Sequence, residues 1–286
     1  MIGLGAVRIG ALLLVSVAFS VRSSAQAPAG PDRAPDVVFV ATPLGVVDAM
    51  LNLARVTESD VVFDLGSGDG RIVIAAAKHY GARSVGIEID SNLVAESRRS
   101  AEAAGVGERA EFRRGNLFAT DLRRASVVTL YLGRTLNERL RPILLRNLRP
   151  GTRVVSQNFD MGDWRPDSVV LVRGRNFGET PVHLWVIPAN VAGTWDVTVE
   201  GRGAGPKRFQ LVLAQRYQAL TGEVRPAVGE LLLERARLRA DSLIFALAGS
   251  GTELQFQGGV EGNTASGTVG SGAGAEQRRW RAARVR

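Results

Sequence analysis

Acidic side chains and glycines share one short turn of this chain. The stretch Val61-Val-Phe-Asp-Leu-Gly-Ser-Gly-Asp-Gly-Arg-Ile-Val-Ile74 reads as an apolar run, a glycine-rich turn and a second apolar run. Glycine turns between a strand and a helix often present backbone amides to a phosphate. Here the turn carries two carboxylates, Asp64 and Asp69, which would repel a phosphate. The residue types therefore indicate a ligand that allows close backbone approach and prefers negative charge around it.

A dinucleotide fits this turn poorly. Its fingerprint places glycines at the first, third and sixth positions. Gly66 and Gly68 match the first two positions, but the sixth position is Arg71. At an effective dielectric constant near 20, one like-charge pair 4 Å apart costs about 4 kcal/mol. Charge and spacing therefore both disfavour a pyrophosphate.

S-adenosylmethionine meets the opposite requirement, because it has no phosphate and carries an ammonium and a sulfonium. Asp64 ends a strand and can attract the cationic methionine moiety, while Gly66 and Gly68 permit close backbone approach. Glu88 ends the next strand about twenty residues further on, where a carboxylate meets ribose hydroxyls in folds of this kind. A tight turn without a ligand and a solvent-facing Glu88 are the plain structural alternatives.

Strand and helix patterns alternate around these residues from residue 36 to about 189. We expect strands at 60–64, 84–90, 110–114, 126–132 and 153–156, and helices at 46–54, 71–80, 92–104 and 135–148. Repeated β-α units predict an α/β fold, a doubly wound and mostly parallel seven-stranded sheet. Apolar runs at 168–172 and 182–187 predict the hairpin that closes this sheet.

The pattern changes after Pro188. Short runs at 194–200, 209–214, 229–234, 242–248 and 252–257 alternate in polarity, with glycine clusters between many of them. Such spacing is typical of an antiparallel meander or a small barrel. The glycine-rich segment 258–274 leaves tight turns and partial disorder both open. We therefore expect an α/β domain over residues 36–189 and a small antiparallel β domain over 190–286, with Trp195, Phe209 and Trp280 in its core.

The N-terminus is expected to lie outside both domains. Arg8 precedes an uncharged and mostly apolar run from Ile9 to Val21, and small residues follow at 23–25. This order is typical of a secretory signal peptide. An uncleaved membrane anchor is the alternative, although a spanning helix needs about twenty apolar residues. We predict a signal peptide or anchor at 1–25 and a linker at 26–35, with the protein exported to the periplasm if cleavage occurs and anchored to the inner membrane otherwise.

Composition excludes several classes of site. The chain has no cysteine and two histidines, which excludes disulfides, zinc fingers and a thiolate nucleophile, and we expect no metal. The formal net charge is +8, but the basic residues do not interleave with aromatic ones in a stripe. We therefore expect no nucleic-acid partner.

Residues 36 to about 187 resemble class I S-adenosylmethionine-dependent methyltransferases. The first motif of that family corresponds to Asp64–Arg71, "DLGSGDGR", and its acidic second-strand motif to Gly86–Asp90, "GIEID". The stretches "ATPLGVVDAMLNLA" and "VVTLYL" are similar to a branch that includes mitochondrial protein-lysine N-methyltransferases, which act on inner-membrane proteins and have hydrophobic N-terminal segments. The resemblance implies S-adenosyl-L-methionine as cofactor and a protein substrate, with a membrane protein as one option, and membrane association through the N-terminal segment.

The resemblance also assigns roles to individual residues. It implies cofactor binding by seven of them: Thr42, Pro43, Asp64, Gly66, Gly68, Glu88 and Asn116. Asn116 stands where the family usually has an aspartate at the adenine edge, and asparagine offers both a donor and an acceptor. Tyr131 and Asp160 follow the fourth and fifth strands and are the candidate catalytic residues. A core position for Tyr131 and a turn role for Asp160 are the alternatives.

Two functions follow from these observations. The first is methyl transfer to a protein lysine, which requires alignment of the nucleophile with the methyl group and loss of a proton from the lysine. The second is a non-catalytic envelope protein with a vestigial methyltransferase fold and a β-type binding module, because a cleaved signal peptide would separate the domain from its cofactor. We favour the methyltransferase, since the acidic cofactor residues are in place.

Overall fold

The computed structural model describes residues 37–174, 178–203, 205–225, 231–249, 252–271 and 277–285. The predicted signal peptide or anchor at 1–25 and the linker at 26–35 lie outside these described residues. Within the described ranges, no helix is both long enough and apolar enough to span a bilayer.

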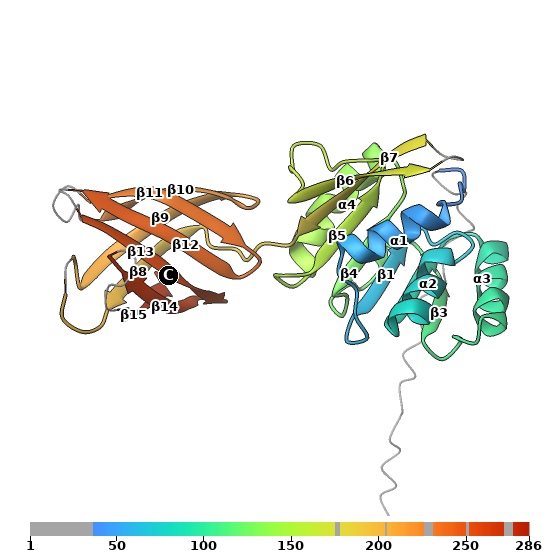
Figure 1. The fold of residues 1–286 in the computed structure, drawn as a ribbon, viewed down its shortest axis with the longest axis horizontal. Helices are drawn as coiled ribbons and strands as arrows, with labels where there is room; N and C mark the ends of the chain where they lie inside the picture. Colours follow the sequence, from blue (N-terminus) through green and yellow to red (C-terminus); the bar gives the residue numbers. More distant parts are fainter. Residues whose placement is uncertain are drawn as a thin grey trace, which may run out of the picture. The chain divides into compact units, whose positions relative to one another are not determined.

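The first domain is an α/β sheet whose strand order, over the described residues, is β3-β2-β1-β4-β5-β7-β6 (Figure 1). Strands β1 to β5 are parallel, whereas β7 runs antiparallel to β5 and pairs with the edge strand β6. This confirms the predicted doubly wound, mostly parallel sheet with its closing hairpin. The strands are β1 Val61–Leu65, β2 Arg83–Glu88, β3 Ala110–Arg114, β4 Val127–Leu130, β5 Arg153–Gln157, β6 Ser168–Gly174 and β7 Gly178–Val186.

Helices cover both faces of this sheet. They are α1 Leu44–Leu53, α2 Arg71–Tyr80, α3 Ser91–Ala103 and α4 Arg134–Asn147. Alternate residues of each central strand point to opposite faces, so Val62 packs with α1 and α2 while Phe63 packs with α4. Burial of the central strands on both faces explains their continuous apolar runs.

Glycines and one aspartate set the ends of the helices beside the glycine-rich turn. Helix α2 begins after Gly70, at φ +81°, and ends at Gly81, at φ +68°, where a side chain would be strained. Helix α3 begins at Asp90, whose carboxylate accepts a hydrogen bond from the backbone N–H of Asn92 at 2.7 Å. These boundaries fix where the turn joins the sheet edge.

The second domain is a closed antiparallel barrel, with the order β10-β11-β12-β13-β14-β15-β8-β9 among the described residues. The predicted β-rich domain is therefore a barrel. Strand β7 ends at Val186 and β8 begins at Gly193, so the expected boundary near residue 189 falls in the connection. The strands are β8 Gly193–Val199, β9 Arg208–Arg216, β10 Ala219–Arg225, β11 Leu232–Arg239, β12 Ser242–Gly249, β13 Thr252–Glu261, β14 Thr264–Gly270 and β15 Arg278–Arg284.

Two sequence predictions for the barrel differ from the structure. The strand expected at 229–234 overlaps β11, Leu232–Arg239, where arginines alternate with smaller apolar residues, and residues 229 and 230 lie outside the described ranges. The glycine-rich segment expected as turns or disorder is mostly strand, in β13 and β14. A Cβ atom on Gly258 would overlap the carbonyl oxygen of Ser266 and the Trp280 ring, so glycine here permits close strand approach.

Aromatic rings fill the barrel interior. Phe245 and Phe256 stack with ring centroids 4.4 Å apart, and Trp280 meets Phe245 edge-on at 5.7 Å. Trp195, Phe209 and Trp280 are buried, which confirms their predicted place in the core.

Removal of one stacked ring tests this interior. We expect Phe256→Ala to lower the free energy of unfolding by about 3–5 kcal/mol, because it leaves a cavity in a fully buried position. The matched control is Ile244→Ala on β12, where the side chain is 44% exposed, and the expected loss is below about 1 kcal/mol. Urea unfolding followed by tryptophan fluorescence measures both. Equal losses for the two variants would contradict a packed interior.

Candidate active site

The candidate active site is a cavity of about 450 Å³ at the carboxyl edge of the parallel strands. Parallel α/β sheets bind their ligands at this edge. Six predicted site residues line it, namely Thr42, Asp64, Gly66, Glu88, Asn116 and Tyr131. Pro43, Gly68 and Asp160 do not belong to its lining.

Asp64 places a buried carboxylate at the base of the cavity. It is the penultimate residue of β1 and is 3% exposed, and the Thr129 hydroxyl donates to its Oδ1 at 2.7 Å. Burial raises the pKa of Asp64 to about 7; the Thr129 hydrogen bond opposes this rise, and the negative charges of Glu88 and Asp69 add to it. A cation in the cavity would offset the lost hydration and favour the ionised carboxylate.

Glu88 ties the glycine-rich turn to the end of β2. Its Oε2 accepts a hydrogen bond from the N–H of Gly68 at 2.9 Å, and its Oε1 accepts from Ile89 and Asp90 at 2.7 and 3.0 Å. A carboxylate has about four acceptor sites. Glu88 can therefore order the turn and still accept a hydrogen bond from a ribose hydroxyl.

Gly66 and Gly68 are required by their conformation and by their neighbours. Their φ angles are +79° and +53°, in the region that favours glycine. A Cβ atom on Gly66 would lie 2.5 Å from Leu132 Cδ2, and one on Gly68 would overlap the Phe39 ring. The turn therefore has no side chain at Gly66, where it lines the cavity, and packs against Phe39 at Gly68.

Asp69 does not offer a second unpaired carboxylate to the ligand. Arg71 Nη2 lies 2.5 Å from its Oδ2, and Arg71 Nη1 also donates to the backbone oxygen of Thr42 at 2.7 Å. Repulsion of phosphate at this turn therefore comes chiefly from Asp64 and Glu88. The Arg71 contact, which is not predicted from the sequence, also explains why Thr42 lies against the turn.

Asn116 presents a donor to the cavity. Its Oδ1 accepts a hydrogen bond from the N–H of Phe118 at 2.9 Å and so caps the short 3-10 helix η1, Leu117–Ala119. Because this contact occupies Oδ1, the Nδ2 group is left to donate. Adenine ring nitrogens accept hydrogen bonds, so Asn116 suits an adenine edge in a different way from an aspartate.

Tyr131 lines the cavity just after β4 and contacts the turn that follows β5. Tyr131 stacks on Phe159, with ring centroids 6.0 Å apart and planes at 22°. Asn137, fully buried on α4, donates through Nδ2 to Ser156 Oγ at 2.9 Å and to the Phe159 carbonyl oxygen at 3.0 Å. Neither Phe159 nor Asn137 is predicted from the sequence, since only the packing of α4 against β5 brings them to the site.

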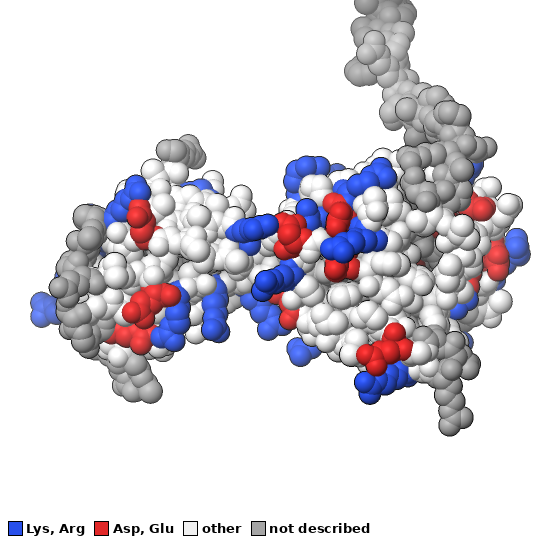
Figure 2. Space-filling view, turned by 90° about the horizontal axis from the view of Figure 1, so that it is seen from above, with Lys and Arg blue, Asp and Glu red and all other residues white. Residues whose placement is uncertain are grey.

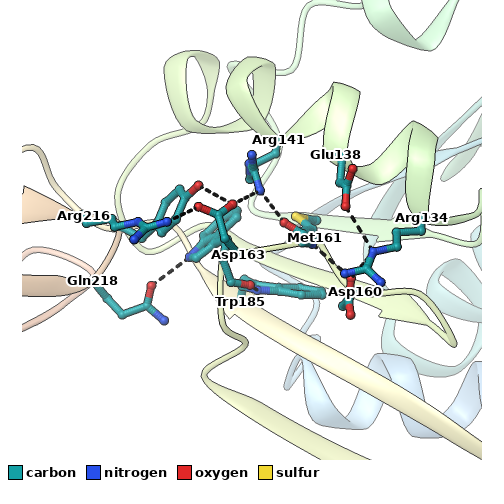
Figure 3. A network of polar contacts seen from close by, with 12 residues as sticks. Arg134, Glu138, Arg141, Asp160, Met161, Asp163, Trp185, Arg216 and Gln218 are labelled. Atoms are coloured by element: carbon teal, nitrogen blue, oxygen red, sulfur yellow. Dashed lines mark hydrogen bonds and ion pairs between the residues drawn. The ribbon is translucent and has the colours of Figure 1, made fainter.

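Asp160 lies beside this aromatic pair rather than in the cavity wall. Its Oδ1 is 3.2 Å from Arg134 Nε and accepts a hydrogen bond from the Gly162 N–H at 3.0 Å (Figure 3). Arg134 also donates to Glu138 at 3.1 Å. Asp160 therefore forms a turn contact with Gly162 and an ion pair with Arg134.

Comparisons with known proteins agree with this geometry. The ANTKMT methyltransferase domain family matches residues 64–168. A protein-lysine N-methyltransferase of Saccharolobus islandicus is 44% identical over 154 residues, which are 54% of this chain and 95% of that protein. The chain belongs to the S-adenosylmethionine-dependent protein-lysine methyltransferases.

Other relatives also match the methyltransferase part. An adenine nucleotide translocase lysine N-methyltransferase of Mus musculus is 32% identical over 157 residues and covers 55% of this chain and 65% of its own length. A crystal structure titled RNA methyltransferase from Salinibacter ruber in complex with S-adenosyl-L-homocysteine is 55% identical, with a TM-score of 0.51, and covers 53% of this chain and 96% of its own.

S-adenosylmethionine is the cofactor of this methyltransferase, and the cavity residues fit it. Asp64 is a buried anion suited to the cationic methionine moiety. Gly66 lines the cavity without a side chain, whereas Gly68 keeps the turn closely packed against Phe39. Glu88 and Asn116 place polar atoms in the lining, of types suited to ribose hydroxyls and adenine ring nitrogens.

The raised pKa of Asp64 predicts pH-dependent cofactor binding. If only the ionised carboxylate binds the cation, the affinity for S-adenosylmethionine rises roughly fifteenfold between about pH 5.5 and 7.0, with proton release on binding. Isothermal titration calorimetry in two buffers of different ionisation enthalpy measures both quantities. In Asp64→Asn we expect affinity at least about tenfold weaker at neutral pH and little pH dependence. The control is Asp48→Asn, an exposed aspartate on α1; an unchanged pH profile in Asp64→Asn would contradict the assignment.

The same pKa predicts how the stability of the protein without cofactor depends on pH. The folded-state pKa of about 7 lies above the ordinary value of 3.8, so the folded state binds the proton more tightly. Its contribution to stability is therefore present below about pH 4 and is lost as pH rises through about 7. We expect Asp64→Asn to be more stable than the parent near pH 8 in thermal unfolding without cofactor, and a less stable variant would contradict this.

Proposed function

We propose that the methyl acceptor is a lysine of a protein, which approaches the cofactor cavity beside Tyr131 and Phe159. The observation that carries this proposal is the pairing of the buried Asp64 cavity with an aromatic and acidic edge at Tyr131, Phe159 and Asp160. An aromatic wall suits the apolar stem of a lysine, and carboxylates suit its charged end. The relative named for adenine nucleotide translocase supports a protein acceptor.

When bound, S-adenosylmethionine supplies the methyl group, whose bond to sulfur breaks as the bond to the lysine nitrogen forms. Asp64 would hold the cationic end of the cofactor, and Glu88 orders the glycine-rich turn through the Gly68 N–H. Leu132 and Leu136 form an apolar part of the lining and reduce the access of water. Catalysis then depends chiefly on alignment of the three reacting atoms.

The lysine must lose a proton before it attacks. Asp160 is our candidate to receive this proton, either directly or through water. The Asp160 side chain is 39% exposed beside Arg134, so the proton would pass on to solvent at this edge. Tyr131 lies between this edge and the cofactor cavity and is the candidate to orient the amine.

RNA is the competing acceptor class, because the Salinibacter ruber structure is titled an RNA methyltransferase. On the face drawn in Figure 2, basic side chains lie beside acidic ones rather than forming a continuous basic stripe. RNA binding draws chiefly on uninterrupted positive charge. We therefore favour the protein acceptor and treat RNA labelling as the outcome that would overturn it.

We predict that the enzyme labels lysine when incubated with S-adenosylmethionine carrying a tritiated methyl group. The acceptors tested are a lysine-containing peptide array and total RNA, with acid hydrolysis and amino-acid analysis of labelled peptides. Methyl-lysine that depends on Asp64 supports the proposal. Label in RNA alone, or no label in peptides under conditions where the cofactor binds, would overturn it.

Tyr131→Ala is expected to lower kcat/KM for the labelled peptide on the order of tenfold to a hundredfold, because the amine loses an orienting wall. The dissociation constant of S-adenosylmethionine should change far less, since Asp64 and Glu88 are intact. Tyr80→Ala is the matched control, because Tyr80 ends α2 and contacts Asn52. A Tyr131→Ala variant with parental kcat/KM would exclude a role for this side chain in acceptor binding.

We further propose that residues 1–25 keep the enzyme at the inner membrane without cleavage, with the catalytic domain on the cytoplasmic side. The apolar run from Ile9 to Val21 supports membrane association, and the need for S-adenosylmethionine supports the cytoplasmic side. A reporter fused to the C-terminus, active on only one side of the membrane, tests the orientation. Release of residues 26–286 into the periplasm would overturn the proposal.

A further inference from the structure

The barrel contacts the methyltransferase domain through the tip of its β9–β10 hairpin, formed by Arg216, Tyr217 and Gln218 (Figure 3). Arg216 Nη2 lies 2.6 Å from Asp163 Oδ2, and the Tyr217 hydroxyl donates to Asp163 Oδ1 at 3.0 Å. Tyr217 has a φ of +57°, which turns the tip toward this contact. These hydrogen bonds lower the pKa of Asp163 to about 2, so the pair stays charged at physiological pH.

Trp164 depends on the same hairpin tip. Its side chain is fully buried, its indole N–H donates to Gln218 Oε1 at 2.8 Å, and its ring stacks on Tyr217 with centroids 5.6 Å apart. Its carbonyl oxygen accepts from the Trp185 indole at 2.8 Å. Without the tip, the Trp164 ring would lose its stack on Tyr217 and its buried indole N–H would lose its acceptor.

Asp163 and Trp164 belong to residues 158–165, which we call the acceptor loop. The first part of this loop carries Phe159, stacked on Tyr131 at the cofactor cavity. Arg141 joins the two parts, because it binds Asp163 and also donates to the Met161 carbonyl oxygen at 2.5 Å. Contacts therefore run from the barrel to Met161, which is two residues along the chain from Phe159, the ring that stacks on Tyr131.

The strength of these contacts indicates what they do. Exposed ion pairs such as Arg216 with Asp163 contribute little to stability. The stack and the hydrogen bond to buried Trp164 fix the loop geometry more strongly. The Saccharolobus islandicus relative is little longer than the 154 residues that align, which are 95% of it, so an equivalent barrel has no room in that chain.

We propose that the hairpin tip positions the acceptor loop, so that the barrel sets the affinity of this enzyme for its methyl acceptor. Arg216, Tyr217 and Gln218 are positioning residues, because they act on the reaction through Trp164, Asp163 and the Tyr131–Phe159 pair. The assignment of the acceptor as a protein lysine rests on the proposed function, whereas the ordering of the loop does not.

The full chain with Tyr217→Ala or Gln218→Ala tests this role. We expect faster backbone hydrogen exchange in residues 158–165 and a KM for the labelled lysine peptide raised on the order of tenfold. The dissociation constant of S-adenosylmethionine should stay within about twofold, because the cofactor residues are not touched. Tyr217→Phe keeps the stack and loses only the bond to Asp163, so its effect should be smaller.

Arg281→Ala is the matched control, since Arg281 pairs with Glu200 at 3.1 Å within the barrel. It should leave exchange in the acceptor loop and the acceptor KM unchanged. The proposal is overturned if Tyr217→Ala lowers the melting temperature but leaves loop exchange and acceptor KM at parental values. If the parent labels RNA instead of lysine, the proposed function fails. Hydrogen exchange in the acceptor loop and the KM for RNA then still test the role of the hairpin tip.

Discussion

One desolvated carboxylate is the constraint on which the methyltransferase domain depends. Asp64 is held at the end of a central strand, with Thr129 as a hydrogen-bond donor, in a place that water hardly reaches. Such a group is unfavourable until a cation joins it. The glycines of the turn and its hydrogen bond to Glu88 set the shape of the cavity beside this group.

The acidic side chains around the glycine-rich turn differ in how far their charge is balanced by neighbouring groups. Asp69 is paired with Arg71, and Glu88 accepts three backbone hydrogen bonds. Asp64 is therefore the acidic group of the turn whose charge is left for the ligand to balance. The Asp69–Arg71 pair has a structural task, because Arg71 also holds the Thr42 backbone against the cavity.

Local patterns in the sequence predicted the sheet, its helices and the residues at the strand ends, because these depend on periodicity and turn chemistry. The partners of those residues depend on long-range packing. Phe159 and Asn137 come together only when α4 lies on β5. In the barrel, Gly258 and Gly267 resembled turn residues, although their small size serves close strand contact.

The closure of the barrel has a mechanical consequence. The described residues of β10 and β11 share a registered pair only at Ala219 and Arg237, whereas β9 and β10 pair from Ala219 to Arg225. The barrel would therefore open first between β10 and β11 under heat or force. Strand β10 follows the Tyr217 turn directly. Separation of β10 from β11 would therefore weaken the contacts of the hairpin tip with Trp164, while Asp64 and its surroundings stayed folded. On heating, methyl transfer would then be lost at a lower temperature than the binding of S-adenosylmethionine.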